Sequence, residues 1–167
     1  MKSLQPQMMP DSGGTQEIDD VREPPLGAVL DFMRMLWALD HALQSASKRM
    51  EATFGLTGPQ RLVVRIVGRF PGIAAGRVAD ILHVHPSTLT GILKRLETRG
   101  VLQRRPDPRD ARRALFTLTA RGRKLDTVRT GTVEQAVRRV LAKEPDKVAA
   151  AQEILAALSG ELDAGLR

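Results

Sequence analysis

Small hydroxyl-bearing and cationic side chains share one face of a helix that is predicted to begin near Pro86. The other face of this helix is apolar, because leucine or isoleucine recurs at i, i+3, i+4 and i+7: Leu89, Ile92, Leu93 and Leu96. The polar face consists of Ser87, Thr88, Thr90, Gly91, Lys94 and Arg95. Small polar residues near a helix N-terminus let the backbone approach DNA closely, while cations reach base edges or phosphates. This face is therefore typical of a helix that lies in the major groove.

A β-hairpin with a charged tip is predicted directly after this helix. Gly100 suits the left-handed position that ends a helix. Residues 101–105 and 114–118 form two short strand-like segments, and the prolines of 106–110, Pro-Asp-Pro-Arg-Asp, favour a turn between them. A helix that is followed by a basic hairpin predicts a winged helix.

Positive charge is concentrated in the same part of the chain. Between Lys94 and Lys124 there are eleven lysines and arginines and three acids, a net charge of +8, whereas the whole chain carries +7 and the remainder therefore sums to −1. A basic surface confined to one element indicates a polyanionic partner, although a solvated charged face is the simpler alternative. Aromatic residues make up 3% of the chain, too few for stacked single-stranded bases, so duplex DNA is favoured.

Composition narrows the class of protein further. The 167 residues suffice for one domain with helical extensions. The absence of cysteine excludes disulfides, thiolate catalysis and cysteine-ligated zinc. No stretch approaches 18 uninterrupted apolar residues and the N-terminus has no apolar signal region, so we expect a cytoplasmic protein.

Neither a metal site nor an active site is expected. His83 and His85 suggest a metal site at first reading, but no carboxylate cluster or cysteine accompanies them and zinc needs three or four ligands. Turn and cap packing is the better interpretation. The sequence also lacks the motifs G-x-S-x-G, G-x-G-x-x-G, H-E-x-x-H and the P-loop. We therefore predict no enzyme activity and no cofactor.

The segments before the recognition helix are predicted as an arm and three helices. Residues 1–24 are polar and spaced by prolines, which indicates a flexible arm. A long helix over 26–52 has two apolar faces, one for its own domain and one for a second subunit. A capping box at 57–60 begins a short helix, whose predicted core residues are Leu62, Val63, Ile66, Val67 and Phe70. A third short helix is expected over 74–82.

The C-terminal segments are predicted as two helices outside the winged-helix core. Thr119 is expected to cap one long helix that runs to about Ala142, and a second helix begins near Asp146. The residues of the long helix that should point inward are Leu125, Val128, Ala136 and Val140. The expected fold is mainly α (α+β): a winged helix-turn-helix lobe over 53–118, with N- and C-terminal helices over 25–52 and 119–167 as a dimerisation layer.

The wing and the elements around it resemble the MarR family of bacterial transcriptional regulators, over roughly 26–166. The most specific matches are Asp107, Arg109, Asp110 and Arg112, which fit a D-x-R-D-x-R wing, and the segment 118–122, which fits an L-T-x-x-G entry to the next helix. The resemblance implies a homodimer that binds a pseudopalindromic operator, typically as a repressor, and is released by a small ligand, here an aromatic or anionic one. His85 and Gly91 depart from the usual residues at their positions.

By the same resemblance, Arg109 would enter the minor groove, and Asp107 or Asp110 with Arg112 would hold the wing in shape. The full set of predicted DNA-contacting residues is Ser87, Thr88, Thr90, Gly91, Lys94, Arg95, Arg104, Arg105, Arg109, Arg112 and Arg113. An exposed turn residue is the simpler interpretation of Arg109.

Candidate residues for a ligand pocket lie earlier in the chain. Trp37 and His41 are one turn apart on the first helix, and Arg34, Arg61 or Arg65 could bind an anionic ligand. Core and interface packing is the alternative for all of them. Two other functions also stay open: an effector-independent architectural DNA-binding protein, and a module whose winged helix contacts protein.

Overall fold

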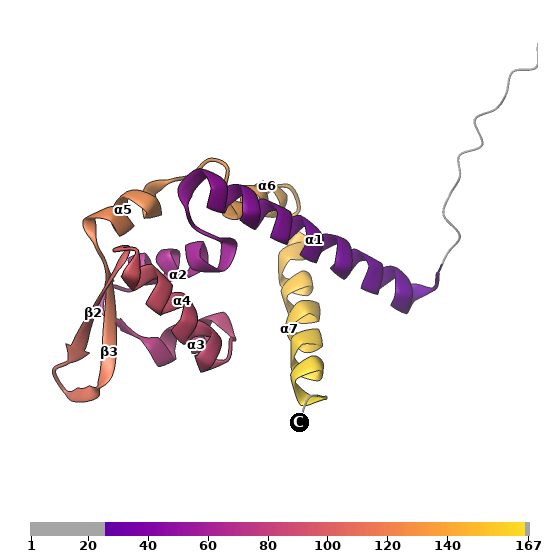
Figure 1. Cartoon of the computed structure of the whole chain (residues 1–167). Helices are drawn as coiled ribbons and strands as arrows, with labels where there is room; N and C mark the ends of the chain where they lie inside the picture. The colour runs from indigo at the N-terminus through magenta and orange to yellow at the C-terminus, as the bar shows by residue number, and fades with distance from the viewer. Residues whose placement is uncertain (1–25, 166–167) are drawn as a thin grey trace, which may run out of the picture.

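The computed structural model describes residues 26–165, so the predicted arm over 1–24 lies outside the described residues. Their elements, in chain order, are α1 (Ala28–Phe54), α2 (Gly58–Arg69), β1 (Ile73–Ala74), α3 (Ala75–Leu82), α4 (Pro86–Thr98), β2 (Leu102–Asp107), β3 (Asp110–Leu118), α5 (Ala120–Thr127), α6 (Val133–Lys143), a 3-10 turn (Pro145–Lys147) and α7 (Val148–Ala164). The predicted class, mainly helical with a small antiparallel wing, is confirmed (Figure 1).

The winged-helix lobe encloses one apolar core. Its residues come from α2, α3, α4 and the sheet, and the most deeply buried are Leu56, Val63, Val64, Val67, Val78, Leu89, Leu96 and Val101. The sheet has the order β1-β3-β2 and all its pairings are antiparallel. Strand β1 is too short to show alternation in the sequence, and it was not predicted. Predicted core residues Leu62 and Phe70 are instead 47% and 50% exposed, because the buried face of α2 runs through Val64.

Local sequence signals set the helix ends inside the lobe. At α2 the capping box is present: the Thr57 hydroxyl accepts from the Gln60 N–H at 3.4 Å, and the Gln60 side chain accepts from the Thr57 N–H at 3.2 Å. Gly100 has φ +66° just after α4, the left-handed position expected of a glycine there. These two predictions are confirmed.

The helix predicted from Thr119 to about Ala142 is wrong, because the structure has two helices there. α5 ends at Thr127, Gly131 takes φ +68°, and the Thr132 hydroxyl accepts from the Gln135 N–H to start α6. A left-handed glycine followed by a new N-cap is incompatible with a continuous helix. Ala136 and Val140, which were expected to point inward, are exposed in the single chain.

Helices α1, α6 and α7 form the part of the chain outside the lobe. In Figure 1, α1 and α7 extend from the lobe on the side away from the wing. Many of their large apolar side chains are exposed, including Val29, Met35, Trp37, Val140, Ile154 and Leu162. The two apolar faces predicted for the first helix are therefore largely uncovered within the described residues.

Candidate nucleic-acid interface

Helix α4 has one buried face and one exposed face, as its periodicity predicts. Leu89, Leu93 and Leu96 are buried in the lobe. All six predicted contact residues lie on the exposed side: Ser87, Thr88, Thr90, Gly91, Lys94 and Arg95. A Cβ placed on Gly91 would meet no heavy atom within 4 Å, so the backbone at this position is open to close approach.

The first turn of α4 is held by side chains of its own sequence. The Nδ1 atom of His85 accepts from the Ser87 N–H at 3.3 Å and lies 2.8 Å from the Ser87 hydroxyl, so histidine does the capping that a hydroxyl or acid usually does. The Thr90 hydroxyl donates to the Pro86 carbonyl at 2.8 Å. Because its proton is used within the helix, Thr90 offers mainly acceptor capacity to an external partner.

The two acids of the wing shape the turn through the backbone. A carboxylate oxygen of Asp107 accepts from the Arg109 N–H at 2.9 Å, and one of Asp110 accepts from the Arg112 N–H at 3.0 Å. Asp107 pairs with Asp110, so the strands reach further into the predicted turn than 105 and 114. The side chain of Arg109 is exposed at the tip.

A groove of about 680 Å³ separates α4 from the wing. Thr90 and Lys94 line it from α4, and Arg104, Arg112 and Arg113 line it from the strands. Glu97 is the only acid in its lining, against four cations. Five of the predicted contact residues are therefore brought together around one basic concavity. The other six do not line it: Ser87, Thr88, Gly91, Arg95, Arg105 and Arg109.

Arg104 and Arg105 point to opposite faces of β2, as consecutive strand residues do. Arg104 lines the groove, whereas Arg105 donates to the Gln103 side chain at 3.4 Å and lines neither of the two hollows beside α4. The structure thus separates two arginines to which the sequence assigned the same role.

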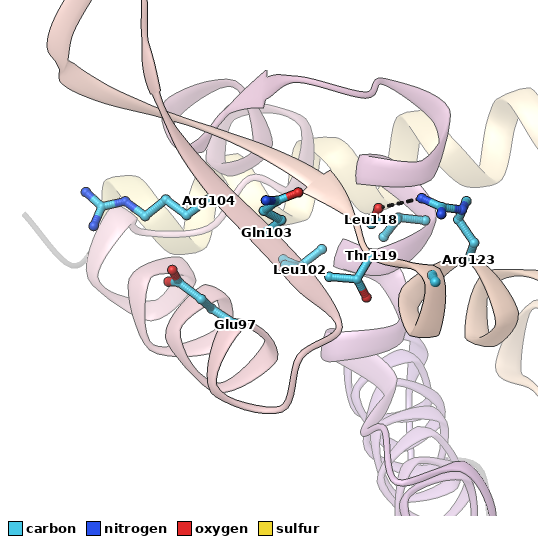
Figure 2. A pocket seen from close by; sticks show the side chains of 8 residues that line it. Glu97, Leu102, Gln103, Arg104, Leu118, Thr119 and Arg123 are labelled. Carbon is cyan, nitrogen blue, oxygen red and sulfur yellow. Dashed lines mark hydrogen bonds between the residues drawn. The ribbon is translucent and has the colours of Figure 1, made fainter.

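A second hollow, of about 490 Å³, lies at the base of the wing. Figure 2 shows it between the end of α4, strand β2 and the start of α5, with the Arg123 guanidinium directed at the Leu118 carbonyl, to which it donates at 2.9 Å. Arg121 donates in the same way to the Arg99 carbonyl at 3.1 Å. These two arginines belong to the basic segment found in the sequence, but they were missing from the predicted contacts, and their charge lies at the wing base.

The L-T-x-x-G segment, residues 118–122, connects the wing base to the end of α4 through hydrogen bonds. The Thr119 hydroxyl donates to the Gly100 carbonyl at 2.7 Å and accepts from the Gly122 N–H at 3.0 Å. A Cβ on Gly122 would lie 2.2 Å from the Val101 carbonyl oxygen, so only glycine fits without a backbone shift. The motif therefore has a steric reason in this fold.

The predicted ligand residues fall into two groups. Arg34, Trp37 and His41 are exposed on α1, with Trp37 75% exposed. Arg61 and Arg65 instead bind groups of α5 and α6: Arg61 is 4% exposed and donates to Glu134 at 2.9 Å, while Arg65 lies 2.6 Å from the Asp126 carboxylate. The structure gives these two arginines an internal role.

Glu134 is the titratable group whose environment is most altered by this arrangement. Burial raises its pKa, but a hydrogen bond from its own backbone, together with the charge and hydrogen bond of Arg61, outweighs burial, and the pKa lies below its usual value. Glu134 is therefore held as a carboxylate beside Arg61.

Two further observations concern residues 26–165. No group of three or more histidine, cysteine, aspartate or glutamate side chains there could hold a metal ion. None of the helices over that range combines the length and the apolar character needed to cross a bilayer.

Comparison with known proteins finds a family profile and several bacterial transcriptional regulators. Residues 54–113 match the profile of the MarR family. The HTH-type transcriptional regulator TtmR of Methylorubrum extorquens is 32% identical over 104 residues, which cover 62% of this chain and 53% of TtmR. An HTH-type transcriptional repressor of Mycobacterium tuberculosis is 29% identical over 109 residues, covering 65% of this chain and 78% of that protein. The chain thus spans about half the length of TtmR.

Solved structures show the same fold. MepR of S. aureus, crystallised with DNA, superposes with a TM-score of 0.62 at 19% identity, over 83% of this chain and 98% of MepR. The resemblance to this family seen in the wing sequence is confirmed by these matches. The segment over 54–113, which holds the helix-turn-helix and most of the wing, matches the MarR family of transcriptional regulators.

Proposed function

We propose that this protein is a homodimeric repressor that binds a pseudopalindromic DNA operator and is released by a small aromatic or anionic ligand. The observation that carries the proposal is the basic groove between α4 and the wing, where cations of two separate elements surround one concavity beside the exposed polar face of α4. A relative described as a repressor supports the direction of regulation.

In the proposed complex, each lobe contacts DNA in two grooves. Helix α4 lies in the major groove with Ser87, Thr88 and Thr90 next to base edges. Arg109, at the tip of the wing, enters the adjacent minor groove, where a narrow A·T segment concentrates negative potential. The groove cations lie between these two contacts and neutralise phosphates.

The proposal of a dimer depends on apolar surface that one chain leaves exposed. Leu26, Val29 and Leu30 of the α1 segment, and Ile154 and Leu162 of α7, are each at least 50% exposed. Apolar surface on this scale, spread over two long helices, is typical of an interface between subunits. A two-fold dimer would also present two copies of α4 to a palindromic site.

A ligand is proposed to bind beside α1, near Trp37, His41 and Arg34. An indole and an imidazole one turn apart can cover an aromatic ring, and a guanidinium can pair with its carboxylate. Release follows if the ligand prefers a conformation in which the two α4 helices no longer match the operator spacing.

Fluorescence anisotropy on duplexes that tile the gene's own upstream region, each compared with scrambled duplex at two salt concentrations, tests DNA recognition. A specific regulator should prefer one palindromic fragment by ~10³ or more. A ratio near one with a steep salt dependence would instead establish an architectural DNA-binding protein. Absence of binding at low salt would leave the winged helix as a protein-contacting module.

The same assay tests whether a ligand releases the protein from its operator. Phenolic acids and their thioesters, titrated into the protein–operator complex, should lower the anisotropy, and Trp37→Ala should weaken that response without changing operator affinity. An operator affinity that no member of the panel changes would remove this ligand class.

A further inference from the structure

Arg61 is a buried cation that joins the winged-helix lobe to both sides of the α5–α6 break. It lies on α2, which also carries core residues of the lobe, and is 4% exposed. Its guanidinium donates to the carbonyls of Leu125 and Val128, the second at 2.7 Å, and its Nε donates to Glu134 at 2.9 Å. Leu125 and Val128 lie at the end of α5, and Glu134 lies in the first turn of α6.

Arg65, one helical turn further along α2, strengthens the same connection. Its Nη1 atom lies 2.6 Å from the Asp126 carboxylate, and its Nε lies 3.7 Å from the Glu134 carboxylate. Gly68 completes this face of α2, because a Cβ there would lie 2.9 Å from Asp126. We name Arg61, Arg65, Asp126 and Glu134 the junction cluster.

The chemistry of the junction cluster explains why the chain breaks where it does. The last carbonyls of a helix have no partner in the helix and carry partial negative charge, so two guanidinium groups stabilise the end of α5. Glu134 carries a negative charge in the first turn of α6, where the helix dipole favours it. One side chain of α2 therefore fixes the end of one helix and the start of the next.

Within the described residues, the junction cluster leaves one hydrogen-bond acceptor without a partner. One carboxylate oxygen of Glu134 is buried without a hydrogen-bond partner, which costs free energy. Glu134 thus holds its position through Arg61 rather than through a complete set of hydrogen bonds. Its contact with Arg61 links the lobe directly to α6.

The break also lies at the boundary between the two parts of the molecule. α2 belongs to the lobe, whereas α6 packs against α1 and leads to α7, on the side away from the wing (Figure 1). A rotation of α6 about residues 128–132 would change the angle between the lobe and the exposed apolar helices. The Arg61–Glu134 contact opposes that rotation.

We propose that the Arg61–Glu134 contact sets the angle between the lobe and the dimerisation helices, and thereby the half-site spacing that the dimer accepts. The inference rests on the proposed function, because spacing has meaning only for a dimer on a two-part operator. Arg61 and Glu134 are positioning residues in this view: they act on DNA only through the placement of α4.

Operators whose half-sites are moved apart or together by single base pairs test this directly. Wild type should bind one spacing at least ~10-fold more tightly than its neighbours, because each added base pair also rotates one half-site around the helix. Glu134→Gln, which keeps the size of the side chain, and Arg61→Lys, which keeps its charge, should reduce that ratio to ~3-fold or less while non-specific binding stays unchanged.

Val64→Ala is the matched control, because Val64 is buried on α2 but contacts the lobe core instead of the junction cluster. It should lower the melting temperature and leave the spacing ratio unchanged. Variants of the junction cluster that keep the wild-type ratio would overturn this inference alone. If wild type itself binds no operator, the proposed function fails and this inference fails with it.

Discussion

The wing and the α5–α6 junction use arginine in opposite ways. At the wing, Arg109 and Arg112 are exposed, and acids next to them bind their backbone N–H groups, which leaves the guanidinium charge to an external partner. At the junction, Arg61 is buried and binds a carboxylate and the end of a helix. The same residue type would thus supply DNA affinity in one region under the proposed function, and it supplies internal geometry in the other, so the two roles should respond differently to substitution.

The largest effect on stability is expected from Arg61→Ala. It removes the buried cation from half-buried Glu134 and from the last carbonyls of α5, where Arg65 remains, so the loss should approach but not exceed the ~3–5 kcal/mol typical of breaking a fully buried pair. Urea denaturation should show this loss. Arg109→Ala, the matched change at the wing, should change the free energy of unfolding by no more than about 0.5 kcal/mol. Equal losses for the two variants would abolish the contrast between the regions.

Gly122→Ala should also destabilise the fold, by ~1–3 kcal/mol, because its Cβ would lie 2.2 Å from the Val101 carbonyl oxygen and the backbone must move. Gly91→Ala is the control: it is also helical, but it has open space, so it should stabilise α4 by ~0.5–1 kcal/mol. Thermal unfolding of the two variants compares them. A melting temperature for Gly122→Ala equal to that of wild type would show that the contact can relax freely.

For DNA binding, in contrast to stability, we expect a substitution at the wing to have a large effect. Arg109→Ala should weaken operator binding by ~1–3 kcal/mol and relax the preference for A·T pairs at the flanks. Anisotropy with operators altered only at those pairs measures this. If the variant loses the same affinity on every sequence, Arg109 contacts phosphate instead of the minor groove.

A smaller effect is expected at β2, where the comparison can be made between neighbours. Arg104→Ala removes a cation from the groove and should reduce the salt slope by ~1 with a uniform loss across sequences, whereas Arg105→Ala should do less, because Arg105 points to the other face. Salt titrations of operator binding by both variants measure which substitution reduces the slope more. The opposite order would mean that DNA follows the other face of the wing.

The smallest expected effect concerns pH. Because the pKa of Glu134 is lowered in the folded state, its contribution to stability is present above the unfolded pKa and is lost as the pH falls through the folded pKa. Stability measured by urea denaturation across the acidic range should therefore fall less steeply for Glu134→Gln than for wild type. Parallel curves would show that Glu134 contributes nothing to the acid sensitivity of the fold.

Local signals were sufficient to predict the helices and the hairpin of the lobe, but not its short strand β1. The capping box at Thr57 and the left-handed Gly100 each act within a few residues of their own position, and the structure has both where the sequence indicates. The predicted contact residues of α4 share one exposed face because a helix of known start fixes its faces.

Features that depend on distant contacts were not predictable in the same way. In the sequence, Arg61 looks like an ordinary surface cation. Its burial depends on the carbonyls at the end of α5, which lie more than sixty residues later in the chain. The break before α6 has a local signal, Thr130-Gly131-Thr132, but the apolar spacing on both sides favoured one continuous helix. The two hollows beside α4 exist only after the hairpin folds back on the helix. Strand alternation places Arg104 and Arg105 on opposite faces, but only the structure shows that Arg104 is the one that lines the groove.

Strand β2 is an edge of the sheet, and this has a consequence for handling the protein at high concentration. An exposed strand edge can pair with the edge of another molecule and start aggregation. Here Pro106 lacks an N–H to offer, and Arg104 and Arg105 place charge along the same strand. The wing cations therefore also act as a barrier to self-association. Variants that replace several of them to abolish DNA binding should keep Pro106 and at least one charge on β2 to remain monodisperse.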